Sequence, residues 1–302
     1  MKFCIVIPTY NGGDLWAETV SSLSKYGPNA ADVYIIDSNS SDQTVNLAKS
    51  VGFNVKVIDK SSFNHGGTRN EMALSLKDKY DIAIFLTQDA IPEEGFCEAI
   101  IASFSDDKVA CSYGRQLPHT NANVLAIHAR NFNYPAASHC YSMQDANSVG
   151  LKTVFTSNSF AAYRLSIFDM IGGFPTRTIL SEDMYFAAQA VITGYKVAYV
   201  SEARVRHSHN YSVMEEFKRY FDIGVFHCEQ PWIRDKFGGA GGEGKKFIIS
   251  ELTYLLKMSP LAIPRACISN MAKISGYKAG QNYKKLPESL VRKFSMHKRY
   301  WM

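Results

Sequence analysis

The sequence predicts an α/β fold: a mostly parallel twisted sheet flanked by helices, followed by a basic helical extension. Short apolar runs alternate with helical patterns over residues 1–115. These runs lack polar alternation, which is typical of strands in a sheet that helices cover on both faces. Residues 241–302 hold twelve Lys and Arg against three Asp and Glu, although the formal net charge of the whole chain is only +5. A slightly acidic body with a basic extension is therefore expected.

The first part of the chain predicts a succession of strand–helix units. Expected strands span residues 3–8, 33–37, 54–58, 81–86 and 108–114. Expected helices span residues 14–27, 41–52 and 93–104, and a further helix follows the glycine-containing turn 62–70. Trp16, Val20 and Leu23 would form the buried face of the first helix. Ser41 and Thr68 would cap the second and third helices.

The second part is less regular. Residues 116–152, rich in Asn, Ser, His and Pro, predict a long functional loop or lid. After it we expect strands at 154–164 and 195–200 and helices at 181–194 and 213–226. The stretch 238–244 is rich enough in glycine to predict a hinge. Pro260, Pro264 and Pro287 predict that the helices of the basic tail are short.

Composition narrows the class of protein. No apolar run reaches the length of about 18 residues that a spanning helix needs, and the apolar N-terminus reads as a strand rather than a signal peptide. The six cysteines include no Cys-x-x-Cys pair, so we expect buried free thiols, a reducing cytoplasmic compartment and no cysteine zinc site. The basic tail suits an anionic partner, either nucleic acid or a membrane surface.

Polar segments follow four of the expected strands: "PTYN", "DSNSSD", "SFNHGGTRN" and "TQDAIP". Each alone is an ordinary strand end. The carboxyl ends of parallel strands meet at one edge of a sheet, and ligands of such sheets bind there. The four segments together therefore predict one ligand site at this edge.

These segments, with "GGFP" and "LSEDMYFAAQAVITGYKVAYV" further on, resemble family 2 glycosyltransferases of the GT-A fold. The resemblance covers residues 3–209 and keeps the family's order and spacing. "FNHGGTRN" resembles the rhamnosyltransferase subgroup, which uses a dTDP-linked deoxysugar. The resemblance implies a catalytic domain, 1–210, with a nucleotide-binding part, 1–115, an acceptor-binding part, 116–210, and a helical extension, 211–302.

The resemblance also implies a set of donor-binding residues. The first-strand residues would line the nucleobase slot, Asp37 would accept the base imide N–H, and Arg69 would reach the base or the diphosphate. Glycines would let the turn approach the nucleotide, and Asn64 and His65 would face the sugar. Taken without the resemblance, this is an ordinary Gly-Gly turn before a helix. The full implied set is Pro8, Thr9, Tyr10, Asp37, Asn64, His65, Gly67, Arg69, Gln88 and Asp89.

A divalent metal is implied by "TQDA", which stands where the family has Asp-x-Asp. Thr87 replaces the first aspartate, so Asp89 is left to bind Mg²⁺ or Mn²⁺ at the diphosphate. His207 is the expected second ligand and His209 the alternative. The competing interpretation is a helix-capping aspartate and structural histidines.

Asp183 in "SEDM" matches the family's catalytic base, and Glu182 would position groups on the acceptor side. Ser181 would cap the helix, and the helix dipole would keep the Asp183 carboxylate ionised near neutral pH. Acidic residues are also favoured in first turns for helix stability alone.

The predicted function is an inverting transfer of L-rhamnose from dTDP-rhamnose to a saccharide, by analogy a lipid-linked polysaccharide precursor at the cytoplasmic face of the membrane. The tail, residues 245–302, would dock on the anionic surface of that membrane, and nucleic acid is not expected as a partner. Alternatively, the tail packs on the catalytic domain or on a second subunit. Other readings are a UDP-sugar transferase, a non-catalytic carbohydrate-binding module, and a nucleotide-sugar-forming enzyme. The last is disfavoured because "PTYNGGDLW" lacks a basic residue.

Overall fold

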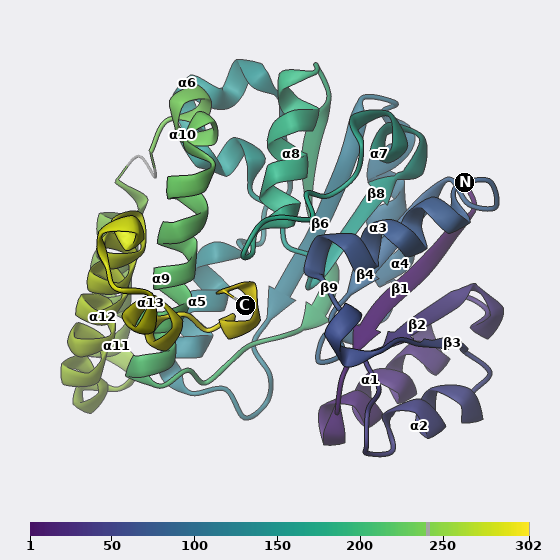
Figure 1. Cartoon of the computed structure of the whole chain (residues 1–302), viewed down its shortest axis with the longest axis horizontal. Coiled ribbons are helices and arrows are strands. Elements are labelled where there is room, and N and C mark those ends of the chain that lie inside the picture. Colours follow the sequence, from purple (N-terminus) through teal and green to yellow (C-terminus); the bar gives the residue numbers. More distant parts are fainter. Residues whose placement is uncertain (240–241, 302) are drawn as a thin grey trace.

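The computed structural model describes residues 1–239 and 242–301. One nine-stranded sheet forms the centre, and helices α9 to α13 form a separate layer beside it (Figure 1). The strand order is β3-β2-β1-β4-β8-β6-β9-β5, with β7 paired to β9. The strands are β1 (Phe3–Thr9), β2 (Val33–Asp37), β3 (Asn54–Val57), β4 (Ile82–Leu86), β5 (Ile91–Pro92), β6 (Val109–Leu117), β7 (His139–Tyr141), β8 (Phe160–Arg164) and β9 (Lys196–Arg206).

The sheet is mixed and mostly parallel, which confirms the predicted fold class. β3, β2, β1 and β4 pair in parallel, and β6 pairs in parallel with β9. β8 runs antiparallel between β4 and β6, so the two parallel groups point the same way. The carboxyl ends of β1, β2, β4 and β6 therefore reach the same edge of the sheet, and this edge carries the polar segments.

Helices cover both faces of the sheet. The longest of the first part is α1 (Gly13–Tyr26), and its face of Trp16, Val20 and Leu23 is buried as predicted. The remaining α-helices up to the helical layer are α2 (Thr44–Ser50), α3 (His65–Leu76), α4 (Phe96–Ala102), α5 (Val124–Asn133), α6 (Ala146–Val149), α7 (Leu165–Ile171) and α8 (Glu182–Ile192).

Both predicted helix caps in the first part are wrong. The third helix begins at His65, because the Asn64 side chain accepts the backbone N–H of Gly67 at 2.7 Å. Thr68 lies inside the helix, so "HGGTRN" is its first two turns rather than a loop. The second helix begins at Thr44 without a side-chain cap, and Ser41 lies outside it.

The predicted long loop at 116–152 is also wrong, because this segment holds α5, β7 and α6. The Asn123 side chain caps α5 by accepting the N–H groups of Leu125 and Ala126. The polar residues that suggested a loop include this cap. The strand expected at 154–164 is limited to β8, and β9 extends beyond the expected 195–200 to Arg206.

The basic tail is more regular than its prolines indicated. The helical layer consists of α9 (Val213–Glu229), α10 (Pro231–Phe237), α11 (Glu243–Met258), α12 (Ile263–Gln281) and α13 (Glu288–Phe294). α12 has 19 residues, because Pro264 sits in its first turn, where a missing N–H breaks no helical bond. A Cβ at Gly276 or Gly280 would lie 2.3 or 2.0 Å from a carbonyl oxygen of α9, so these glycines allow α9 and α12 to pack closely. Residues 240–241 of the predicted hinge lie outside the described residues.

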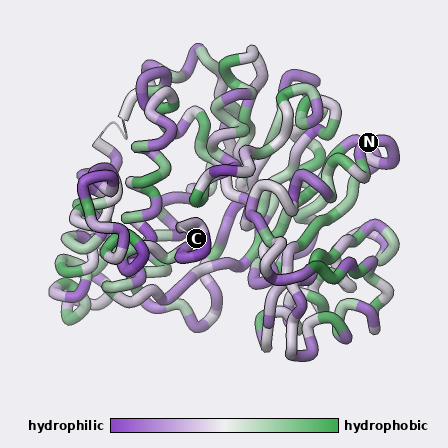
Figure 2. The backbone as a smooth tube through the Cα atoms, viewed as in Figure 1, coloured by the Kyte–Doolittle hydropathy of each residue, from purple (hydrophilic) through white to green (hydrophobic). Residues whose placement is uncertain are grey.

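The core has two parts, one on each face of the sheet. Figure 2 shows hydrophobic segments, in green, along strands of the sheet and in helices beside them. Phe221, Val225 and Phe226 of α9 belong to the larger part, so the extension packs on the catalytic domain rather than hanging from it. The domain boundary at residue 210 remains a prediction.

Cysteine burial agrees only in part with expectation. All six cysteines are free thiols; Cys4, Cys97 and Cys111 are buried, but Cys140 and Cys267 are exposed. Among the described residues, none of the helices is both long and apolar enough to span a bilayer.

Candidate functional site

A cavity of about 410 Å³ lies at the polar edge of the sheet, and we call it the donor cavity. It brings together most of the predicted donor-binding residues. The predicted residues on its wall are Pro8, Thr9, Tyr10, His65, Arg69, Gln88, Asp89, His207 and His209. Asp37, Asn64, Gly67, Glu182 and Asp183 are not part of this wall in the described chain.

Hydrogen bonds with Gln88 and Asp37 fix the segment at the end of β1 that lines the donor cavity. Gln88 accepts the backbone N–H of Tyr10 at 2.8 Å and donates to its carbonyl at 3.2 Å. The buried Asp37 carboxylate accepts the Thr9 hydroxyl at 2.8 Å and both the N–H and hydroxyl of Ser40. Asp37 thus fixes the end of β1 to the loop after β2. Its contact with a base imide remains a prediction.

The start of α3 is shaped by packing and by an ion pair. A Cβ at Gly66 would lie 2.1 Å from the carbonyl oxygen of Pro175, which explains one glycine without a nucleotide. The buried Arg69 guanidinium donates to Glu182 Oε1 at 3.1 Å and to the carbonyl of His65 at 3.0 Å. Arg69 therefore lines the donor cavity while holding the acidic pair of α8. Its contact with the donor remains a prediction.

The predicted metal ligands lie together. Asp89, His207 and His209 each offer a ligand atom, and these atoms all lie within 4.8 Å of one another. The Asp89 carboxylate is 3.5 Å from His207 Nε2 and 3.8 Å from His209 Nε2. The favoured ligand His207 and the alternative His209 thus face the same carboxylate.

Hydrogen bonds behind the cluster set the state of His207. Its Nδ1 lies 2.8 Å from Gln116 Oε1, which can only accept, so Nδ1 carries the proton. The Nε2 atom then faces the Asp89 carboxylate. Gln116 is fixed by Ser157, to which its amide donates at 3.0 Å, and by Arg130, which donates to the same Oε1 at 2.5 Å. Such support behind a ligand is typical of metal-binding histidines.

The charge states in this cluster suit metal binding. Burial alone would raise the pKa of Asp89, but its hydrogen bond to His207 and the nearby imidazoles hold that pKa well below its usual range. Burial lowers the pKa of His209 to about 4. At neutral pH the cluster therefore offers a carboxylate and a neutral imidazole. One oxygen and two nitrogen donors fit a divalent transition ion such as Mn²⁺ better than Mg²⁺, which prefers oxygen.

Asp183 does not line the donor cavity, but it contacts a segment that does. One carboxylate oxygen accepts the N–H of Asn158 at 2.9 Å and the other the N–H of Met184 at 2.8 Å. Asn158 is followed by Ser159, which lines the donor cavity. Asp183 is in the first turn of α8 as predicted, but Ser181 makes no side-chain cap and adopts a left-handed φ of 58°.

The start of the helix lowers the pKa of Asp183 as expected, but two other effects outweigh it. Burial and the adjacent Glu182 carboxylate raise the pKa of Asp183 to about 7, although the two N–H groups and Arg69 oppose this shift. A carboxylate that titrates near the working pH suits a general base. By contrast, Arg69 and His65 help hold the pKa of the buried Glu182 below its ordinary value, against the effect of burial.

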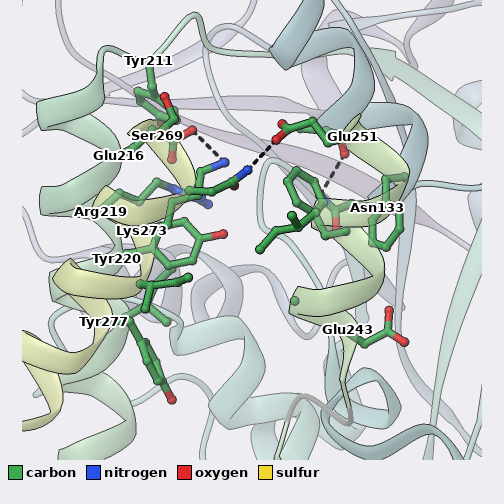
Figure 3. Close-up of a pocket in the computed structure, with 18 of the residues that line it drawn as sticks. Asn133, Tyr211, Glu216, Arg219, Tyr220, Glu243, Glu251, Ser269, Lys273 and Tyr277 are labelled. Atoms are coloured by element: carbon green, nitrogen blue, oxygen red, sulfur yellow. Dashed lines mark hydrogen bonds and ion pairs between the residues drawn. The ribbon is translucent and has the colours of Figure 1, made fainter. Parts of the chain in front are cut away.

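A second cavity, of about 590 Å³, lies within the helical layer between α5, α9, α11 and α12. We call it the helical cavity. Figure 3 shows Arg219 and Lys273 on one side and Asn133 and Glu243 on the other. Lys273 pairs with Glu216 at 3.3 Å, whereas Arg219 forms neither a hydrogen bond nor a salt bridge with the described residues. His209 lines both cavities, so they meet at the candidate metal cluster.

Two cations of the donor cavity were not predicted. Lys60 precedes the third helix and lies 3.9 Å from the centroid of the Tyr10 ring. Arg299, at the end of the chain, donates to the carbonyl of Lys60 at 2.9 Å. The basic composition of the tail was visible in the sequence. Its contact with Lys60 was not, because the two segments lie 239 positions apart. The residues of the helical cavity carried no motif at all.

Comparison with known sequences places the chain among sugar transferases. The Glycosyl transferase family 2 model matches residues 4–172. The O-antigen chain rhamnosyltransferase WbaN of Salmonella anatum is 52% identical over 99% of this chain and 96% of its own. The O-antigen chain rhamnosyltransferase RfbN of Salmonella typhimurium is 50% identical over 100% of this chain and 96% of its own. These relatives confirm the rhamnosyltransferase-like subgroup that "FNHGGTRN" indicated.

Solved structures support the GT-A-like fold. The mannosyltransferase PcManGT of Pyrobaculum calidifontis, in complex with GDP-Man and Mn²⁺, aligns with a TM-score of 0.57 at 19% identity, over 99% of this chain and 84% of its own. Residues 1–349 of Staphylococcus aureus TarS, in complex with UDP-GlcNAc, align with a TM-score of 0.51 at 14% identity, over 94% and 92%. The family match over 4–172 and the two full-length relatives agree, so the chain belongs to glycosyl transferase family 2.

Proposed function

We propose that this glycosyltransferase transfers L-rhamnose from dTDP-L-rhamnose to a saccharide acceptor with inversion at the anomeric carbon. The observation that carries the proposal is the donor cavity, where the ends of β1 and β4 meet the Asp89, His207 and His209 cluster. The names of the two full-length relatives support rhamnose as the sugar and an O-antigen chain as the product.

The charges of the donor cavity support an anionic nucleotide. Lys60 and Arg299 contact a phenol and a carbonyl, and neither forms a salt bridge with a described residue. Two uncompensated cations in one cavity favour a diphosphate. Tyr10 offers a partly exposed ring on which a nucleobase can stack.

Asp89, His207 and His209 would hold a divalent ion. When bound, such an ion supplies Lewis-acid stabilisation of the diphosphate leaving group. We favour Mn²⁺, because two imidazoles and one carboxylate form the donor set. The structural neighbour PcManGT was solved in complex with Mn²⁺.

Asp183 would remove the proton of the acceptor hydroxyl. Its pKa of about 7 supports this role, as does the contact of its carboxylate with Asn158, which precedes Ser159 of the donor cavity. Glu182 would keep Asp183 and Arg69 in position through the ion pair to Arg69. The acceptor would enter through the helical cavity, since that cavity meets the donor cavity at His209.

A donor screen tests the proposal. Purified protein with Mn²⁺ is titrated with dTDP-rhamnose, UDP-glucose and UDP-GlcNAc, and transfer is followed on a lipid-linked saccharide acceptor. We expect dTDP-rhamnose to bind most tightly and EDTA to abolish transfer. Preference for a UDP-sugar would contradict the donor assignment while leaving the reaction class intact.

The surface of α11 and α12 supports a peripheral position on an anionic membrane. Leu261, between these helices, is 95% exposed, and Leu256, Met258 and Met271 are also exposed. Exposed basic residues flank them at Lys245, Lys246, Lys257 and Arg265. Apolar side chains beside cations suit the interface of an anionic bilayer. The end of the tail, by contrast, contacts the donor cavity.

Flotation with vesicles tests this position. The protein should float with phosphatidylglycerol vesicles at low salt, and a Leu261→Ser, Met258→Ser variant should float less. Met170→Ser, on α7, serves as a matched control because Met170 is similarly exposed outside the patch. Wild-type protein that ignores anionic vesicles at low salt would exclude the membrane role.

A further inference from the structure

The last residues of the chain fold back toward the sheet. After α13 the segment Ser295–Trp301, which we call the C-terminal strap, lies between the helical layer and the sheet (Figure 1). Its two ends are fixed to α9. The buried Asp222 accepts the N–H groups of Met296 at 2.8 Å and His297 at 3.3 Å. At the other end the Tyr300 hydroxyl donates to Glu229 at 2.8 Å.

The strap also contacts the start of α3 and the segment before it. The His297 ring packs edge-on against His65, with 5.2 Å between ring centroids. Arg299 donates from Nη1 to the carbonyl of Lys60 at 2.9 Å and lines the donor cavity with Asp89. The strap therefore joins two parts of the chain that lie 239 positions apart in sequence.

Two features separate Arg299 from an ordinary surface arginine. It has no acidic partner among the described residues, although it lies in a cavity that also holds the cation Lys60. Only one of its donors is used, so the rest of the guanidinium is free to bind a ligand oxygen. Its neighbour Lys298 is also exposed and basic, but it is not part of the cavity wall.

We propose that Arg299 binds the diphosphate of the nucleotide donor and that the C-terminal strap completes the donor site. The inference rests on the proposed function, because it takes the ligand of the donor cavity to be a nucleoside diphosphate. A guanidinium held by a backbone carbonyl presents its remaining N–H groups in a fixed plane, which suits bidentate contact with phosphate oxygens. The anchors on α9 keep this plane at the cavity.

Calorimetric titration of dTDP, UDP and GDP into wild-type protein, Arg299→Ala, Arg299→Lys and Lys298→Ala, with Mn²⁺ present, tests the proposal. Loss of a charged hydrogen bond weakens binding by roughly tenfold or more. We expect that loss for Arg299→Ala, partial recovery for Arg299→Lys, and affinity within about twofold of wild type for Lys298→Ala. In the transfer assay Arg299→Ala should raise the donor KM more than it lowers kcat.

The outcomes separate this proposal from the proposed function. If Arg299→Ala binds a nucleoside diphosphate as tightly as wild-type protein does, the proposed role of Arg299 is overturned and the proposed function still stands. Wild-type protein that binds none of the three nucleotides overturns both. Thermal unfolding of each variant is measured alongside, and loss of affinity together with a large fall in Tm for Arg299→Lys as well as Arg299→Ala would assign Arg299 to folding instead.

Discussion

The two cavities of this protein are built in different ways. The donor cavity is formed mainly by short segments at strand ends, and its positions are fixed by backbone pairing of β1 with β2 and β4. The helical cavity is formed by side chains from α5, α9, α11 and α12, and its shape depends on how these helices pack. If the donor binds at the sheet edge and the acceptor in the helical cavity, as proposed, strand pairing fixes the donor contacts and helix packing shapes the acceptor contacts.

The largest expected effect is that of Asp183→Asn, which should lower the rate of transfer without weakening donor binding. Asp183→Asn should lower kcat by about a hundred- to ten-thousand-fold, because a general base is lost. Binding of dTDP should be unchanged, since Asp183 is not part of the donor cavity wall. Single-turnover transfer and calorimetry measure the two effects. Near-normal turnover by the variant would exclude Asp183 as the base.

The donor cavity itself should respond to loss of its carboxylate. Asp89→Ala should reduce Mn²⁺ affinity and transfer by about a hundredfold, the upper end of the loss caused by removing a ligand's outer-shell partner, because Asp89 is the sole carboxylate of the cluster. Mn²⁺ titration of the protein without nucleotide provides a readout independent of activity. Asp42→Ala, which removes a carboxylate in the loop before α2, is the control. Full activity of both variants in EDTA would show that no metal is needed.

A substitution in the helical cavity should weaken acceptor binding and leave donor binding unchanged. Arg219→Ala should raise the KM for the acceptor by roughly tenfold and leave dTDP affinity unchanged, because Arg219 lines only the helical cavity. Lys218→Ala, its neighbour on α9, is a matched control that does not line the cavity. An unchanged acceptor KM, or a weakened donor, would place the acceptor elsewhere.

The difference between the cavities also explains what could be predicted from sequence. The ends of β1 and β4 follow directly from apolar runs, so Tyr10, Gln88 and Asp89 were located by their neighbours in sequence. The start of α3 was misjudged because two glycines suggest a turn, whereas the Asn64 cap places both in the first turn of the helix. The close approach of Pro175 explains why Gly66 carries no side chain. Arg299 and Arg219 depend on tertiary packing of distant helices. Neither periodicity nor motif spacing reports such contacts.

The smallest expected effect concerns the pH dependence of the base. Asp183 acts only when ionised, and its pKa is raised to about 7, so kcat/KM should rise with pH through that value and level off above it. Glu182→Gln removes the adjacent negative charge and releases the positive charge of Arg69. Both changes favour ionised Asp183 and lower its pKa. The acid limb should therefore shift to lower pH, so that the variant keeps a larger share of its own maximal activity at pH 6.

This shift distinguishes an electrostatic role of Glu182 from a purely structural one. If Glu182 only holds Arg69 in place, the variant should lose activity equally at all pH values, because the pKa of Asp183 would be unchanged. Asp169→Asn provides the control, since its carboxylate pairs with Lys77 at the surface and its loss should leave the pH profile as in wild type. If Glu182→Gln has a normal Tm and the midpoint of its pH–kcat/KM profile is unshifted, Glu182 does not set the pKa of Asp183. The raised pKa of Asp183 would then arise from its burial alone, and the packing around the start of α8 would set the lower pH limit of transfer.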